Sequence, residues 1–170
     1  MPTEPTKDYL HHLVESLREE LKEYGEMLVL LDQQQEMVMR RQTQDLLQCV
    51  QTINTQVENV IAARLEREQR QRNAARMLGL AEDTTFSDLI PQAPGDYRPL
   101  IQALVQENNE LLKRIQRRAR QNHILLSRIV ELMQRLFDPF FPGSRTTTYT
   151  ETGVMAGTGL PKQSLYEAIG

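Results

Sequence analysis

The chain has 170 residues, of which 25% are charged and only 5% are aromatic, and it contains no tryptophan. This length fits a single domain, and a composition so poor in aromatic residues suits long helices packed side by side. The net charge of -3 gives no overall attraction to nucleic acid or to an anionic membrane, and the single Cys49 excludes an internal disulfide and a zinc site built from several cysteines.

The first predicted helix covers residues 6–40 and begins after Pro5, with Thr6 or Asp8 as its N-cap. Its apolar residues recur in a seven-residue pattern and form one long seam, which becomes polar from Gln33 onward. The residues of the apolar seam are Leu10, Val14, Leu17, Leu21, Tyr24, Leu28, Leu31 and Val38.

The second predicted helix covers residues 43–78 and ends at Gly79, because glycine is a typical helix stop. No proline or glycine lies between the middle of the first helix and this stop, so the pattern allows one continuous rod or a hairpin. We favour a hairpin that turns between Arg40 and Thr43. The apolar pattern fades there, and the two halves have similar lengths, as antiparallel neighbours should.

Residues 79–97, with two prolines and two glycines, form a predicted linker that has room for a short helical turn. The third predicted helix covers residues 98–137. Three of every seven positions in it are apolar, and this stripe is wide enough to face two neighbouring helices, as in a bundle. Asn108 and Asn122 share one row of the stripe. We interpret them as buried polar residues that fix the register at some cost in stability, in preference to ligand contacts.

Residues 138–170 contain five of the eight glycines, three of the eight prolines and a run of threonines. Too little apolar surface remains in this segment to offset the entropy of the chain, so we expect a flexible tail. The predicted fold is therefore all-α. Long antiparallel helices form a three-helix bundle or coiled coil over residues 1–137, followed by a mobile C-terminal tail.

The sequence gives little support to catalysis. His11 and His12 are adjacent, so on a helix their side chains point about 100° apart and cannot bind one metal ion together, and His123 stands alone. The chain lacks a glycine-rich phosphate loop, a nucleophile elbow and an HExxH motif. We expect no enzyme, no cofactor and no metal site.

The sequence also predicts where the protein acts. No stretch approaches the roughly 20 apolar residues that cross a bilayer. The first ten residues lack the basic and then apolar regions of a signal peptide. We therefore expect a cytoplasmic protein.

Two clusters of basic residues allow a nucleic-acid-binding hypothesis, since both could follow a phosphate backbone. We favour a structural role. The first cluster is interleaved with glutamates, both clusters could face the acidic first helix, and no aromatic residues accompany them for base stacking. The clusters are Arg64, Arg67, Arg70, Arg72 and Arg76, and then Lys113, Arg114, Arg117, Arg118 and Arg120.

The last turns of the third helix are apolar, although in an up, down and up arrangement they lie near the polar turn between the first two helices. Their side chains then lack cover and offer several hundred Å² of apolar surface by rough count, near the largest patch that a monomer exposes. We predict a partner-binding site. The alternative is that these residues finish the core or form the seam of a structural homo-oligomeric coiled coil. The residues are Leu125, Leu126, Ile129, Leu132, Met133, Leu136 and Phe137.

Three short motifs resemble one family, the FlgN-type flagellar export chaperones. Residues 72–80, RNAARMLGL, resemble its arginine-rich helix end that closes in Leu-Gly-Leu. Residues 121–126, QNHILL, are similar to the family's Asn-x-x-Leu-Leu stretch in the last helix, and residues 149–153, YTETG, resemble the Tyr-x-x-x-Gly element of its tail. Together with the order of helices, the likeness covers nearly the whole chain.

The resemblance implies an all-helical cytoplasmic chaperone of the flagellar type III export system. Its implied clients are the hook-filament junction proteins FlgK and FlgL, held on the C-terminal helical part until secretion. The resemblance also implies that the tail docks at the export gate component FlhA through Tyr149, with Gly153 as its turn partner. The tail beyond Gly153 departs from the family pattern, and the resemblance leaves its role open.

Overall fold

The computed structural model describes residues 4–137 of the chain, and these residues form four helices. The predicted tail, with Tyr149 and Gly153, lies outside the described residues. The prediction of an all-α fold of long helices is confirmed. The helices are α1 (Glu4–Arg40), α2 (Thr43–Met77), α3 (Phe86–Gln92) and α4 (Arg98–Phe137).

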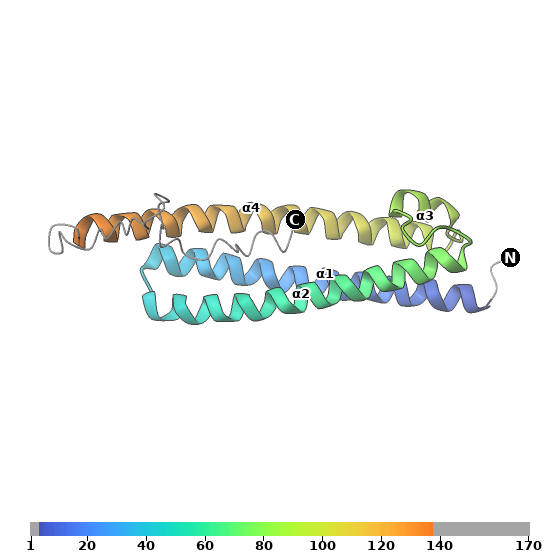
Figure 1. The fold of residues 1–170 in the computed structure, drawn as a ribbon, viewed down its shortest axis with the longest axis horizontal. Coiled ribbons are helices and arrows are strands. Elements are labelled where there is room, and N and C mark those ends of the chain that lie inside the picture. Colours follow the sequence, from blue (N-terminus) through green and yellow to red (C-terminus); the bar gives the residue numbers. More distant parts are fainter. Residues whose placement is uncertain (1–3, 138–170) are drawn as a thin grey trace, which may run out of the picture.

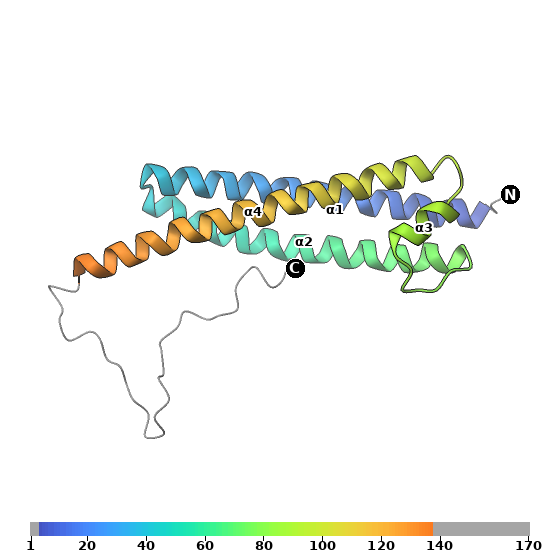
Figure 2. The ribbon, with the colours of Figure 1, turned by 90° about the horizontal axis from the view of Figure 1, so that it is seen from above.

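The long helices lie side by side in an elongated bundle (Figure 1). α1 and α2 form an antiparallel hairpin, and α4 runs parallel to α1 (Figure 2). α1 is the central element, because it packs against both α2 and α4. The short α3 packs against the beginning of α4. α4 therefore has a second neighbour, as its wide apolar stripe predicts, but this neighbour is short and covers only one end.

The beginning of α1 differs from the prediction. The helix starts at Glu4, so Pro5 lies in its first turn, and Thr6 and Asp8 lie inside the helix instead of capping it. A proline is tolerated there because the first N–H groups of a helix have no intrahelical acceptor. The proline therefore marks the start of the helix, as predicted, but it lies within the first turn and not before it.

The turn between α1 and α2 occurs at residues 41–42, within the predicted hairpin break. Gln42 N–H donates to Met37 O at 3.0 Å, and Arg41 N–H donates to Val38 O at 3.3 Å. These two hydrogen bonds form a common C-terminal helix motif, the Schellman motif, in which a glycine normally adopts the left-handed conformation. Here Arg41 adopts that conformation, with φ 58°. The end of α2 uses the same motif with the expected residue, Gly79, at φ 73°.

We expect the substitution Arg41→Gly to raise the free energy of unfolding by about 1 kcal/mol, because a side chain at positive φ carries strain that glycine does not. Chemical denaturation with helicity as the readout measures this change. Arg40→Gly is the matched control, since it makes the same replacement one residue earlier, in the last turn of α1. It should lower stability by roughly 1 kcal/mol. A loss of stability in both variants would contradict strain at Arg41.

The core consists of two apolar clusters along the bundle. The first lies at the α3 end and joins all four helices through residues such as Leu17, Ala75, Leu89 and Ile101. The second joins α1, α2 and the middle of α4. It contains Tyr24, Met27, Leu28, Leu31, Cys49, Ile53, Val57, Val60, Ile115 and Ala119.

An ion pair with a buried carboxylate lies at the level between these clusters. Arg67 of α2 donates to both carboxylate oxygens of Glu20 in α1, at 3.0 Å and 3.3 Å. Tyr24 O–H donates to the same carboxylate at 3.0 Å. Burial and the neighbouring Glu20 charge raise the pKa of Tyr24 well above its usual range, so its hydroxyl stays protonated as a donor. The network joins α1 to α2 at one fixed register.

Asn108 and Asn122 are both buried, and they tie α4 to α1 in the same way. Asn108 Nδ2 donates to Leu17 O at 3.0 Å, and Asn122 Nδ2 donates to Leu31 O at 2.7 Å. Each contact spans 91 residues of sequence, so the two amides hold the parallel helices at one constant offset. Their Oδ1 atoms are buried without a hydrogen-bond partner among the described residues. A buried amide oxygen without a partner lowers the stability of the fold. Polar residues that carry this cost at two equivalent positions are typical of those that specify helix register.

Candidate partner-binding surface

The register between α1 and α4 leaves the end of α4 without a neighbour along α1. At the 91-residue offset of the two asparagine contacts, Arg40, the last residue of α1, is level with Glu131. α4 continues to Phe137. In Figure 2 this end of α4 extends past the turn between α1 and α2. The last turns therefore project beyond the helix that covers the rest of α4.

The predicted apolar residues lie at this projecting end. Leu132, Met133 and Leu136 are 59%, 52% and 60% exposed. Leu125, Leu126 and Ile129 lie at a level where α1 still runs beside α4, and they are half-buried. The side chain of Phe137 lies outside the described set. We call these six predicted binding residues the apolar end of α4. They are Leu125, Leu126, Ile129, Leu132, Met133 and Leu136.

Two further residues extend this surface and were missed by sequence reasoning. Ile124 is 45% exposed and Val130 is 46% exposed. Both lie outside the three heptad rows that define the stripe, so the pattern assigned them to the solvent face. The available signal was composition, because five of the seven residues at positions 124–130 are apolar, and only Ser127 and Arg128 are polar.

One salt bridge fixes α4 just before the apolar end. Arg118 pairs with Asp32 of α1 at 2.7 Å and also donates to Gln35. The pair is partly exposed, so it contributes little to stability by itself. Its position matters more, because it holds α4 against the last turns of α1 before α4 extends alone.

Most of the first arginine cluster forms ion pairs within the fold, as the structural interpretation predicts. Four of its five members pair with glutamates within α2, in the following loop, or across to α1, and Arg72 donates to Gln69 instead. The pairs are Arg64 with Glu68, Arg67 with Glu20, Arg70 with Glu66, and Arg76 with Glu82. In the second cluster, Arg118 alone has an ion pair among the described residues, and Lys113, Arg114, Arg117 and Arg120 are exposed. Ion pairing within the described residues therefore accounts for Arg118 but not for the other four cations of the second cluster.

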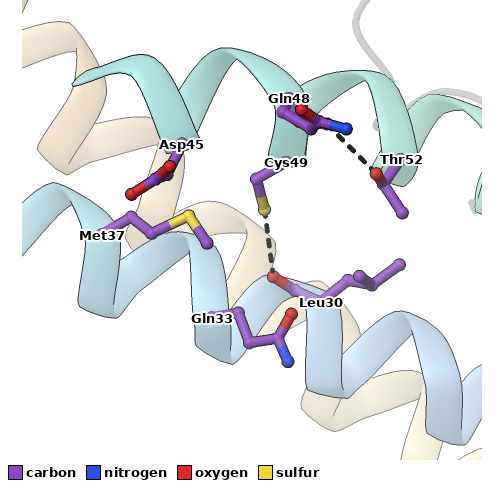
Figure 3. Close-up of a pocket in the computed structure, with 7 residues that line it drawn as sticks. All are labelled: Leu30, Gln33, Met37, Asp45, Gln48, Cys49 and Thr52. Carbon is purple, nitrogen blue, oxygen red and sulfur yellow. Dashed lines mark hydrogen bonds between the residues drawn. The ribbon is translucent and has the colours of Figure 1, made fainter. Parts of the chain in front are cut away.

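A separate hollow lies between α1 and α2, away from the apolar end (Figure 3). It has a volume of about 310 Å³ and is lined by residues that include Cys49 and Asp45. The Cys49 thiol points to Leu30 O, with Sγ at 3.8 Å, and burial raises its pKa. A raised pKa lowers the thiolate fraction, so Cys49 is a poor nucleophile. Within residues 4–137, no three His, Cys, Asp or Glu side chains gather where they could hold a metal ion.

A comparison with known protein families supports the same interpretation as the geometry. The family described as FlgN protein matches residues 1–157, which is most of the chain. The chain belongs to the FlgN family. This match includes the positions of Tyr149 and Gly153 and continues a few residues beyond them. No curated protein and no solved structure matches the chain.

The FlgN family is a family of flagellar export chaperones, so the chain is assigned to that general role and to partners among flagellar proteins. A FlgN-type chaperone functions by binding a client, and an uncovered apolar surface suits that function. In the part of the chain that the structure describes, no helix is both long and apolar enough to span a membrane.

Proposed function

We propose that this FlgN-family protein binds the hook-filament junction proteins FlgK and FlgL in the cytoplasm, prevents their premature association and delivers them to the export gate. The observation that carries the proposal is the apolar end of α4, which projects beyond α1 and exposes Leu132, Met133 and Leu136. An apolar surface of this kind on a soluble bundle is typical of a protein-binding site. The family match supports a chaperone role for it.

The mechanism is one of holding. A terminal segment of the client forms an amphipathic helix and lays its apolar face along the apolar end, with contacts repeating every three to four residues. This covers surface on both proteins that would otherwise associate with other chains. Moderate affinity then permits release at the gate, because most differences in affinity between related complexes reside in the dissociation rate.

The buried asparagines contribute by defining how much of α4 projects. With Asn108 on Leu17 and Asn122 on Leu31, α4 has one register against α1. A shift by one heptad toward the N-terminus of α1 would draw the last turns back alongside α1. We therefore assign Asn108 and Asn122 the role of keeping the apolar end uncovered and available to the client.

Size-exclusion chromatography with light scattering tests this function. The full chain is measured alone and after mixing with purified FlgK or FlgL. The proposal predicts discrete complexes of defined mass with both proteins. A stable homo-oligomer whose mass does not change with concentration, and which binds neither protein, would contradict the proposal and support a structural coiled coil instead.

Delivery to the gate is assigned to the segment after α4. We expect Tyr149→Ala to weaken binding to the export gate component FlhA at least about tenfold while leaving FlgK and FlgL binding unchanged, because an aromatic anchor dominates a small interface. Tyr166→Ala is the matched control, since it removes a second tyrosine beyond the family match. Equal FlhA affinities for Tyr149→Ala and the wild type, measured by calorimetry, would reject this role.

A further inference from the structure

A row of basic side chains follows the outward face of α4 and borders the apolar end. Residues three and four apart share a helix face. This spacing links seven exposed positions, of which five are cations, one is Glu131 and one is Ile124. The row spans roughly 33 Å at 1.5 Å per residue. We call its cations the basic stripe: Lys113, Arg117, Arg120, Arg128 and Arg135.

Within the described part of the chain, the basic stripe makes no ion pair that would explain it as part of the fold. Four arginines of α2 each have a glutamate partner, as described above. No salt bridge joins a cation of the stripe to another residue in the range 4–137. The sequence also has no acidic residue between Glu110 and Glu131. Lys113, Arg117 and Arg120 are like charges three or four residues apart, which destabilise a helix slightly, whereas Glu131 lies between Arg128 and Arg135 at the same spacing.

The stripe is continuous with one edge of the apolar end. Arg128 is three residues from Leu125 and four from Leu132, and Arg135 is three residues from Leu132, so these side chains are neighbours on the helix surface. The opposite edge carries Val130 and Gln134, which are uncharged. The surface therefore has an apolar centre bordered on one side by Arg128 and Arg135, with Glu131 between them, and on the other side by uncharged residues.

We propose that the segment that covers the apolar end is an amphipathic helix with acidic side chains along one edge, and that these side chains pair with the basic stripe. This inference rests on the proposed function, because it defines the chemistry of the partner at the same surface. Charge complementarity at the rim of an interface accelerates association and fixes orientation more than it increases final affinity. One-sided charge thus selects one direction and one face of the client helix.

An acidic helix fits this surface better than a nucleic acid does. The stripe has no aromatic residue on which bases could stack, since Phe137 is the only aromatic residue of α4. The whole chain has a net charge of -3, which opposes long-range attraction of a polyanion. A nucleic acid would also leave the apolar end uncovered, whereas an acidic amphipathic helix covers both features together.

Two synthetic helical peptides test the inference with the full chain. Both carry the same leucine stripe along roughly 20 residues, or about 30 Å of helix. One peptide has glutamates along one edge, and the other has lysines at the same positions. Because like charges repel across an interface, we expect the lysine peptide to bind about tenfold more weakly than the glutamate peptide at low salt by fluorescence anisotropy. The difference should disappear near 1 M salt, where charges are screened beyond roughly 3 Å.

Matched variants show whether the stripe is responsible. Arg128→Glu with Arg135→Glu should abolish the preference for the glutamate peptide or invert it. Arg70→Glu with Arg72→Glu changes the net charge equally, on α2 toward the opposite end of the bundle (Figure 1), and should keep the preference. Equal affinity of the wild type for both peptides, or a preference that persists in the stripe variant, would overturn the inference.

Two further outcomes separate this inference from the proposed function. Binding of FlgK and FlgL that depends on Leu132 and Leu136 but not on Arg128 and Arg135 would keep the function and reject the acidic helix. Selective binding of the acidic peptide without binding of either junction protein would keep the inference and reject the clients. Tight binding of a single-stranded oligonucleotide that the stripe variant loses would overturn the inference in favour of a nucleic-acid partner.

Discussion

Leu132→Asp together with Leu136→Asp should lower the affinity for FlgK and FlgL at least about a hundredfold, because buried apolar anchors at the centre of an interface each contribute roughly 2 kcal/mol or more. Both leucines are well exposed in the free protein, at 59% and 60%. Substitutions at such positions usually change folding stability by no more than about 0.5 kcal/mol. Helicity and thermal unfolding should therefore match the wild type while co-elution with either junction protein is lost.

The control for this variant makes the same chemical change on α2. Leu47 and Leu65 are 68% and 58% exposed, so Leu47→Asp with Leu65→Asp removes a comparable amount of apolar surface. These residues lie on a different helix from the apolar end. We expect this control to bind FlgK and FlgL like the wild type. A similar loss in both double variants would show that general surface hydrophobicity, and not the apolar end, drives association.

Arg67→Met should lower the free energy of unfolding by about 3 kcal/mol, the largest stability effect that we expect from a single substitution. Glu20 is only 3% exposed, and Arg67 supplies two of its hydrogen bonds. Without Arg67 the carboxylate keeps the Tyr24 hydroxyl but loses its neutralising charge, and an uncompensated buried charge typically costs roughly 3–5 kcal/mol. Urea denaturation followed by helicity measures the change.

Two companion variants isolate the cause. Glu20→Gln combined with Arg67→Met removes both charges and keeps an oxygen acceptor for Tyr24, so it should recover most of the lost stability. Arg70→Met breaks the exposed pair with Glu66 at 2.6 Å and should cost less than about 1 kcal/mol. If Arg67→Met and Arg70→Met were equally mild, the buried pair would not stabilise the α1 and α2 register as we infer.

Local sequence signals predicted most of the helical framework. Gly79 marked the end of α2, and the fading apolar pattern marked the turn at residues 41–42. These signals work because they depend on a few neighbouring residues. The start of α1 was misplaced, since Pro5 is compatible both with preceding a helix and with its first turn. The positive φ of Arg41 could not be expected, because the residue type gives no indication of it.

Features that depend on contacts between helices were less accessible. The amide positions in the heptads indicated that Asn108 and Asn122 were unusual, but their common offset to Leu17 and Leu31 follows only from the packed helices. Which arginines form ion pairs also depends on register. Arg67 meets Glu20 across the hairpin, whereas the cations of the basic stripe have no such partner among the described residues. Sequence alone could not separate these two groups.

The site itself was partly predictable. Heptad counting placed Leu132, Met133 and Leu136 on an apolar stripe near a polar turn, and the structure shows them exposed. The apolar stripe did not include Ile124 and Val130. They become part of the surface because none of the described helices covers the outer side of α4 there. That these residues bind a client stays a prediction, as do the roles of Tyr149 and Gly153.

Hydrogen exchange of the full chain, free and bound to FlgK, tests the central claim most directly, because it locates the binding surface without altering the protein. The account predicts that FlgK slows amide exchange along the end of α4, from Ile124 to Leu136, where the last turns of the free protein project beyond α1. Exchange in the first half of α2 should stay unchanged. Protection confined to the hollow between α1 and α2, with no change at the end of α4, would contradict the account.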